Sequence, residues 1–321
     1  MAELNPTLDT SLKVSYITGR KGYLRRKLVN VLMLVLTGAV TLLALFPLFW
    51  IIGYVMAKGG QYINLDLFTQ LPRPAGVAGG GVLHAIEGTL MLTLVAAVVA
   101  IPIGLLAAFY AAYHPNTPLG VGLRFGTDVL SGVPSIVVGI FAYALVVKPS
   151  GHYSLLAGGL AMAIIMLPTT IRTTEEMIKL VPTNLREGAL ALGAPEWKTA
   201  LQVTFPAALS GILTGFMLSL ARASGETAPL LFTALGNDRF DLAKLISGGV
   251  SAGQSIFNIL GNILQQPVDS LALTLYKYSQ DPNINRVNQS WAVAFVLMML
   301  VLIINILARG WVEYRAAKLR G

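Results

Sequence analysis

The sequence contains no cysteine, only three histidines and few charged residues. The absence of cysteine excludes disulfides, thiolate metal sites and a cysteine nucleophile. The histidines, His84, His114 and His152, are scattered along the chain, so we expect no metal site. Charged residues make up 12% of the chain and hydrophobic residues 55%, whereas a soluble domain carries about 25% charged residues. The composition therefore predicts a membrane protein.

Apolar runs long enough to cross a bilayer recur along the chain, since a helical span needs about 20 predominantly apolar residues. We predict an all-α membrane protein with six transmembrane helices and one membrane domain, residues 28–308. The expected spans are residues 28–56, 88–113, 128–147, 153–170, 206–230 and 291–308. No cleavable signal peptide is evident, because the first apolar run is too long for one.

The basic residues indicate how the chain lies in the membrane. The net charge is +8, but the basic residues flank apolar runs and are not interleaved with aromatics, so we expect no nucleic acid partner. Fifteen Lys and Arg residues fall on one side of the predicted spans and seven on the other. The positive-inside rule then places the N-terminal segment 1–27 and the tail 309–321 in the cytoplasm.

Residues 236–289 form a long, partly apolar segment on the opposite, outer side. Apolar residues recur in it at helical intervals on both sides of the Ser/Gly-rich stretch 247–253, which predicts two amphipathic helices separated by a break. This segment either lies on the outer surface or enters the membrane as a re-entrant element.

The loop between the fourth and fifth spans, residues 174–205, has clear local signals. The stretch Leu185–Gly193 is a strong helix former, and Gly193 suits a left-handed C-cap. Pro195 fits the first turn of a second helix, and Pro206 the start of the next span. We therefore predict a rigid cytoplasmic helix–turn–helix whose small residues let another protein approach closely.

This loop resembles the cytoplasmic signature of permease subunits in binding-protein-dependent ABC importers. That signature has Glu-Ala-Ala, then Gly four residues later, and an Ile-x-Leu-Pro ending; here the matching residues are Glu187-Gly188-Ala189, Gly193 and Val203–Pro206. The resemblance implies a type I ABC importer permease fold with a coupling helix that docks on an ATPase subunit. The coupling residues it implies are Arg186, Glu187, Gly188, Ala189, Leu192, Gly193 and Ala194.

The chain carries no recognisable nucleotide site of its own. The string from Gly193 to Thr199 resembles a P-loop, but it lacks the second glycine before the lysine and follows no predicted strand. We therefore expect a transporter subunit that is not an enzyme and binds no cofactor. ATP and Mg²⁺ would be used by a separate ATPase.

The fifth predicted span contains a charge in an otherwise apolar stretch. Arg222 lies inside it, and Glu226 follows four residues later, on the same face of a continuous helix. Burying Arg in a membrane costs about 2.5–3.5 kcal/mol on insertion scales, so such a charge should face a cavity or a partner. Ser224 and Thr227 add hydroxyls nearby, and Pro229 should bend or stop the helix.

Two interpretations of this pair stay open. In the first, Arg222 and Glu226 form an ion pair that only holds helices together. In the second, Arg222 lines an anion path, because a guanidinium matches phosphate oxygens and cannot lose its charge. Arg172, at the cytoplasmic end of the fourth span, either receives the anion at the exit or is an interfacial anchor.

Three longer strings narrow the resemblance to the permeases of phosphate importers, and more to the PstA family than to its sister PstC family. These strings are PSIVVGIFAY (134–143), TTEEMIKLVPTNLREGALALGA (173–194) and ARASGETAPLLFTAL (221–235). The resemblance implies a multi-pass subunit of the bacterial inner membrane that imports phosphate. Its implied partners are a PstC-like sister permease, a PstB-like ATPase dimer and a PstS-like phosphate-binding protein.

Two alternatives remain at this point. The chain could be a permease for another oxyanion, such as sulfate or molybdate. It could also be a stand-alone secondary carrier or channel, which would work without any ATPase. An intramembrane enzyme is less well supported, because no nucleophile–base pair or metal set is recognisable.

Overall fold

The computed structural model describes residues 20–74, 77 and 79–320. The predicted segment 1–27 therefore lies largely outside the described residues. The described chain is almost entirely helical, with no strand, and it holds five helices long and apolar enough to cross a membrane, or six if a bent pair counts as one span. The expectation of an all-α membrane protein with about six spans is confirmed.

The chain divides into two compact units, residues 1–57 and 58–321. The described part of the first unit belongs to α2 (Arg20–Gly59), a 40-residue helix that contains Pro47. It is the first candidate span, because the stretch Gly22–Tyr62 has a mean hydropathy of 2.5 in its most apolar window.

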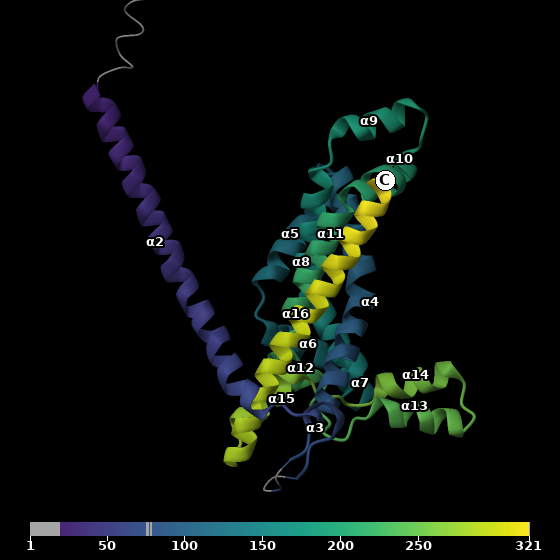
Figure 1. Ribbon diagram of the computed structural model, residues 1–321. Helices are drawn as coiled ribbons and strands as arrows, with labels where there is room; N and C mark the ends of the chain where they lie inside the picture. Colours follow the sequence, from purple (N-terminus) through teal and green to yellow (C-terminus); the bar gives the residue numbers. More distant parts are fainter. Residues whose placement is uncertain (1–19, 75–76, 78, 321) are drawn as a thin grey trace, which may run out of the picture. The chain divides into compact units, whose positions relative to one another are not determined.

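The second unit contains the other candidate spans (Figure 1). They are α4 (Leu83–Tyr113), the bent pair α5 (Pro118–Gly132) and α6 (Ser135–Ala142), α8 (Leu155–Lys179), α11 (Phe205–Ser224) and α16 (Ile284–Arg320). α6 continues through a π-helical turn, η2 (Tyr143–Val147), into α7 (Lys148–Ser150). Most of these helices extend beyond the predicted apolar runs, because polar residues continue the helix into the interface.

Small residues let α4, α8 and α11 pack closely at the centre of this unit. α4 and α8 lie side by side along much of their length. A Cβ atom at Gly158 would lie 2.7 Å from a methyl group of Leu92, and one at Gly104 would lie 2.6 Å from Thr170. Leu92, Met162 and Ala223 are fully or almost fully buried in this core. Such small-residue contacts are how membrane helices approach one another.

The third predicted span is broken. α5 and α6 meet at 106° around Val133 and Pro134, because a proline disfavours helical backbone at the residue before it. α6 packs against the short helix α12 (Ala228–Thr233), and a Cβ atom at Gly139 would lie 2.6 Å from the Cα of Pro229. Two interrupted elements therefore pack against each other inside the bundle.

The segment between α12 and α16 forms three short helices at the end of the unit opposite α9 (Thr183–Ala191) (Figure 1). α13 (Leu242–Ser251) and α14 (Ile256–Gln265) form a hairpin, and α15 (Leu271–Ser279) packs on α16. The predicted break at 247–253 is displaced, because α13 continues through the glycines and turns only at residues 252–255. Gly253, with φ of +67°, makes that turn.

Candidate functional site

The predicted loop helix–turn–helix is present, with α9 followed by α10 (Glu196–Thr199). Gly193 has a φ of +83°, and the amides of Gly193 and Ala194 donate to the carbonyls of Leu190 and Ala189. These bonds satisfy carbonyls at the end of α9, as expected for a glycine C-cap. No residue of α9 is buried, and Leu192 is 91% exposed.

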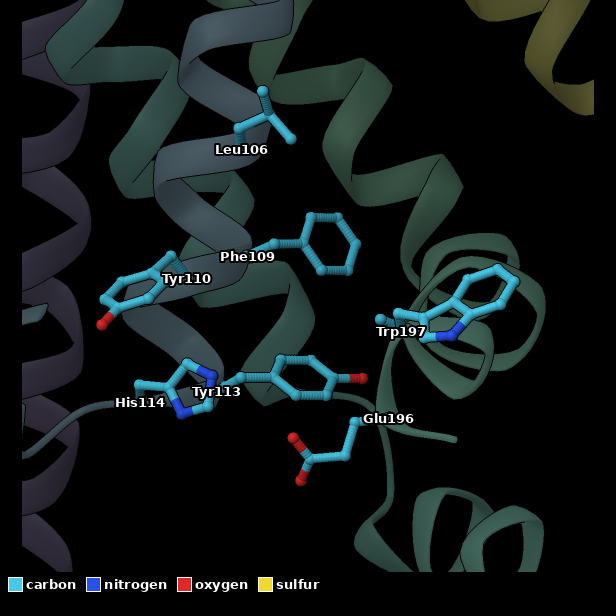
Figure 2. A pocket seen from close by; sticks show the side chains of 8 residues that line it. Leu106, Phe109, Tyr110, Tyr113, His114, Glu196 and Trp197 are labelled. Carbon is cyan, nitrogen blue, oxygen red and sulfur yellow. The ribbon is translucent and has the colours of Figure 1, made fainter. Parts of the chain in front are cut away.

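One side chain ties this helix to the rest of the bundle. The guanidinium of Arg186 lies 3.5 Å from the Glu196 carboxylate of α10. It also stacks over the ring of Tyr113, at the end of α4, with 4.0 Å to the ring centroid. Figure 2 shows Tyr113, Glu196 and Trp197 around the neighbouring pocket, which has a volume of about 470 Å³. Arg186 thus links α9 to both α10 and α4, and Glu187, Gly188 and Leu192 remain exposed.

The second loop helix and the fifth span form one continuous helical stretch, Glu196–Ser224, of 29 residues. Pro206 lies in the first turn of α11, as its position predicts, but α11 is continuous with the helix before it. A π-helical turn, η3 (Ala200–Thr204), precedes it, and such a wider turn accommodates a residue that lacks a backbone N–H. At 1.5 Å per residue the stretch is about 42 Å long, so it connects the loop to Arg222.

The helix ends earlier than predicted. α11 stops at Ser224, and Gly225 and Glu226 donate their amides to the carbonyls of Arg222 and Ala223 in a closing turn. A continuous helix is disfavoured because Pro229 lacks the N–H that would bond the carbonyl of Gly225, and its ring would clash there. Arg222 consequently lies in the last turn of α11 rather than in the middle of a span.

The break also separates Arg222 from Glu226. Glu226 is not on the same helical face, and the two do not form an ion pair among the described residues. The expected i, i+4 pair is therefore absent here because the helix that would align it ends between them. Within the described chain Arg222 is exposed and its side chain has no hydrogen-bond or ion-pair partner, whereas Glu226 and Thr227 are partly exposed.

The hydroxyls near Arg222 face inward. Ser224 is buried, donates to the carbonyl of Leu220 and lies 3.5 Å from the Thr93 hydroxyl of α4. Thr170 of α8 donates to the Ser219 hydroxyl of α11 over 3.3 Å. These contacts hold α11 against α4 and α8, so Ser224 lies on a different side of the helix from the exposed guanidinium.

Arg172 lies within α8, which continues to Lys179. Its guanidinium bonds Asp128 of α5 at 2.7 Å and lies 3.5 Å from Glu176. All three side chains are more than half exposed. Arg172 is therefore paired in this chain, in contrast to Arg222.

A nearby buried carboxylate was not singled out from the sequence. Glu175 is only 6% exposed and lies 2.6 Å from both Arg124 of α5 and Lys179. Arg124 also donates to the carbonyl of Ala111 in α4. The spacing of Glu175 and Lys179 was visible in the sequence, but the contact across 51 residues to Arg124 was not.

A second charged cluster lies at the α15 end. His84, Asp238 and Asp269 could each offer a metal ligand, but the Lys277 ammonium already contacts both carboxylates. Burial opposes ionisation of Asp269, yet His84, 3.6 Å away, and Lys277 outweigh it and hold the pKa of Asp269 below its usual value. Burial likewise opposes the charge of Lys277, but the two aspartates raise the pKa of Lys277. The lysine thus supplies the positive charge in this cluster, which sequence analysis missed because its members are far apart in the chain.

Comparison with known proteins places these features in a family. Residues 100–321 match the model of the binding-protein-dependent transport system inner membrane component. The phosphate transport system permease protein PstA of Yersinia pestis is 40% identical over 90% of this chain and 92% of its own length. The corresponding proteins of Haemophilus influenzae and Mycobacterium leprae are 37% and 36% identical over 90% and 94% of this chain, and 96% and 93% of their own.

Solved structures with low sequence identity share the fold. A bacterial ABC transporter involved in the import of the acidic polysaccharide alginate aligns with a TM-score of 0.55 at 14% identity, over 92% of this chain and 99% of its own. An inward-facing form of the MetNI methionine ABC transporter aligns with a TM-score of 0.52 at 18% identity, over 73% of this chain and 94% of its own. The predicted ABC importer permease fold is confirmed.

Proposed function

The chain belongs to the PstA family of phosphate transport permeases, multi-pass subunits of the bacterial inner membrane, and on this premise we propose that Arg222 contributes the translocation site for phosphate. The family is one of ABC importers, whose permeases work with an ATPase and a binding protein. The chain is thus the permease subunit of a phosphate importer. We further propose roles for individual residues, the partner proteins and the orientation of the chain in the membrane.

The observation that carries the proposal is the exposed, unpaired guanidinium of Arg222 at the end of a 29-residue apolar helix. A lone charge at such a position is costly in a membrane unless it faces water or a partner. A guanidinium offers five N–H donors in a fork that matches two oxygens of phosphate. Facing a shared cavity, Arg222 would receive phosphate there.

We place that cavity between this chain and a PstC-like sister permease, since Arg222 is exposed on the surface of its own bundle. Glu226 and Thr227, just beyond the helix end, line the same cavity, and Glu226 limits how tightly the anion is held. Ser224 supports the site from behind through Thr93. Arg172, held by Asp128, lies toward the cytoplasmic end of α8 and guides the anion out.

The driving force comes from a PstB-like ATPase dimer that binds ATP and Mg²⁺, while this chain binds no cofactor and hydrolyses nothing. The ATPase docks on Arg186–Ala194, where the exposed side chains of Glu187 and Leu192 are available. A displacement of α9 reaches Arg222 through the continuous helix Glu196–Ser224. A PstS-like protein delivers phosphate at the α15 end, and both termini and α9 lie in the cytoplasm.

The test is ATP-dependent uptake of labelled phosphate by the complete importer in proteoliposomes, with sulfate and molybdate as competitors. Arg222→Gln should lower uptake about 10- to 100-fold, the range expected for losing a hydrogen bond to a charged group. Arg222→Lys should restore part of it, because the charge returns without the fork. ATPase recovery in the purified complex should not change.

The matched control is Lys148→Gln, which removes one exposed positive charge from α7, away from the proposed site. It should leave uptake at the wild-type level. Normal phosphate uptake by an assembled Arg222→Gln complex would reject the role of Arg222. Efficient competition by sulfate would instead reject phosphate as the preferred anion.

A further inference from the structure

A basic pocket that Arg222 does not line lies at the α15 end of the bundle. Its volume is about 440 Å³. The basic residues that line it are Arg73, Arg239, Lys277 and Arg286. They come from a turn before α4, the turn after α12, α15 and the start of α16. Because these segments are far apart in sequence, no local sequence pattern predicts the pocket.

The wall that carries Arg239 is a rigid turn. Leu235 and Gly236 adopt φ values of +60° and +92°. The Asn237 side chain accepts from the Arg239 amide at 3.0 Å and donates to the carbonyl of Pro267 at 3.1 Å. Asp238 accepts from Lys277 at 3.2 Å. The turn is thus fixed to both neighbouring segments, and Arg239 projects from a fixed backbone.

The opposite wall is fixed as well. Pro72 and Gly80 form a β-bridge. The Arg286 guanidinium donates to the carbonyl of Arg73, and Gln289 donates to the carbonyl of Gly79 over 3.3 Å. Two α16 side chains therefore clamp the turn before α4 at this rim.

The charges of the pocket are not balanced. Its four basic residues face two lining carboxylates, Asp238 and Asp281. Lys277 is already neutralised by Asp238 and Asp269. Arg239 is exposed, and its guanidinium has no hydrogen-bond or ion-pair partner among the described residues. The pocket therefore keeps positive charge that its own carboxylates do not satisfy.

The pocket also contains an unsatisfied buried donor. Tyr278 is a lining residue, is 5% exposed, and its hydroxyl proton has no acceptor within the described chain. A buried hydroxyl without a partner costs about 1–3 kcal/mol. Burial raises the pKa of Tyr278 to about 12, so the hydroxyl keeps its proton at neutral pH. It can then donate to an acceptor but not repel an anion.

We infer that this pocket is a second oxyanion site, which binds inorganic phosphate through Arg239, Arg286 and the Tyr278 hydroxyl before the ion reaches Arg222. The inference rests on the proposed function for the choice of phosphate among oxyanions. Guanidinium forks and a phenol donor together fit a tetrahedral anion with several acceptor oxygens.

A small ion explains the pocket better than a docked acidic protein does. A carboxylate of another protein can pair with the exposed Arg239, but the Tyr278 hydroxyl is buried. In the proposed site, a bound ion accepts from both groups. The paired Asp238 and Lys277 sit at its edge and limit how tightly a dianion is held.

The test measures binding of labelled inorganic phosphate to the complete importer in nanodiscs, without the binding protein. Arg239→Gln should weaken binding at this site about tenfold or more, as expected for a lost charge-assisted bond. Tyr278→Phe keeps the ring under Arg286, whose guanidinium carbon lies 4.4 Å from the ring centroid. It should weaken binding several-fold with no loss of thermal stability. Lys244→Gln removes a positive charge from α13 outside the pocket and should change nothing.

Each result bears on the inference separately from Arg222. Arg222→Gln should leave this binding intact, and its uptake defect tests the proposed function alone. Equal phosphate binding by wild type, Arg239→Gln and Tyr278→Phe would overturn the inference. A weaker affinity of Arg239→Gln for the binding protein, with phosphate binding unchanged, would overturn it too and make this rim a protein contact. If the importer preferred sulfate, sulfate binding would still depend on Arg239.

Discussion

Replacing either of two glycines at the coupling helix α9 by alanine should change the stability of that helix, but in opposite directions. Gly188 lies in the middle of α9, and Gly193 lies just after it with a φ of +83°. A Cβ atom added at either position meets no atom within 4 Å. Alanine at these sites therefore changes only the backbone energetics, without a steric clash.

The magnitudes follow from those energetics. Alanine is about 0.8–1.0 kcal/mol more favourable than glycine inside a helix, so Gly188→Ala should stabilise α9. A left-handed conformation costs a non-glycine residue about 1–2 kcal/mol, so Gly193→Ala should destabilise it. The equilibrium constant for folding of α9 should therefore rise about fourfold to fivefold in Gly188→Ala and fall about fivefold to 30-fold in Gly193→Ala.

Hydrogen exchange of the α9 amides in the full-length chain is the direct assay, because it reports local opening rather than global unfolding. Protection of residues 185–192 should rise in Gly188→Ala and fall in Gly193→Ala, while protection of α8 stays constant. If both variants shift protection in the same direction, the backbone reasoning is refuted. The stability of α9 would then be set by the contacts of Arg186 with Glu196 and Tyr113.

Three further predictions concern the bundle. Glu175→Gln should lower stability by about 1–3 kcal/mol, because it removes the buried charged acceptor to which Arg124 and Lys179 bond; an unchanged melting temperature would contradict this. The lowered pKa of Asp269 stabilises the fold above the ordinary carboxyl pKa, so the melting temperature should decrease as the pH drops below about 4. Asp269→Asn should make that decrease shallower. An equally steep decrease in the variant argues against this role of Asp269. Since the chain has no cysteine, spin labels can be attached to pairs of cysteines introduced at Lys198, Leu218 and Leu235 without labelling any native residue. On ATP binding, the distance between labels at 198 and 218 should stay constant, and the distance between labels at 218 and 235 should change. The opposite pattern would exclude the break after Ser224 as the flexible point.

The features that sequence predicted correctly depend on local physics. Composition and apolar runs identify the membrane helices, because the bilayer demands long apolar segments. The glycine at 193 ends α9 because only a residue without Cβ accepts its backbone conformation cheaply. The family signature around Glu187 adds to this, since the motif and the local helix signals coincide.

The features that could not be predicted from the sequence depend on tertiary contacts. Pro206 marks the first turn of α11, but a π-helical turn joins α11 to α10 without a break. Glu226 is spaced to pair with Arg222, but the helix ends first. The residues that line the pocket of Tyr278 and Arg239 come from four separate segments. No spacing rule links such residues, so only the folded chain could bring them together.

The break between α11 and α12 determines where movement of α9 can end. On one side, the helix Glu196–Ser224 is continuous with the loop where we propose that the ATPase docks, and it carries Arg222 in its last turn. On the other, α12 packs against α6 through Gly139, and the following turn is fixed by Asn237. Because a continuous helix transmits displacement and residues 225–227 lie outside both helices, the difference in position should develop at the break. Arg222 would then move relative to the pocket at Arg239. A displacement of α9 would thus change the distance between the two proposed phosphate sites.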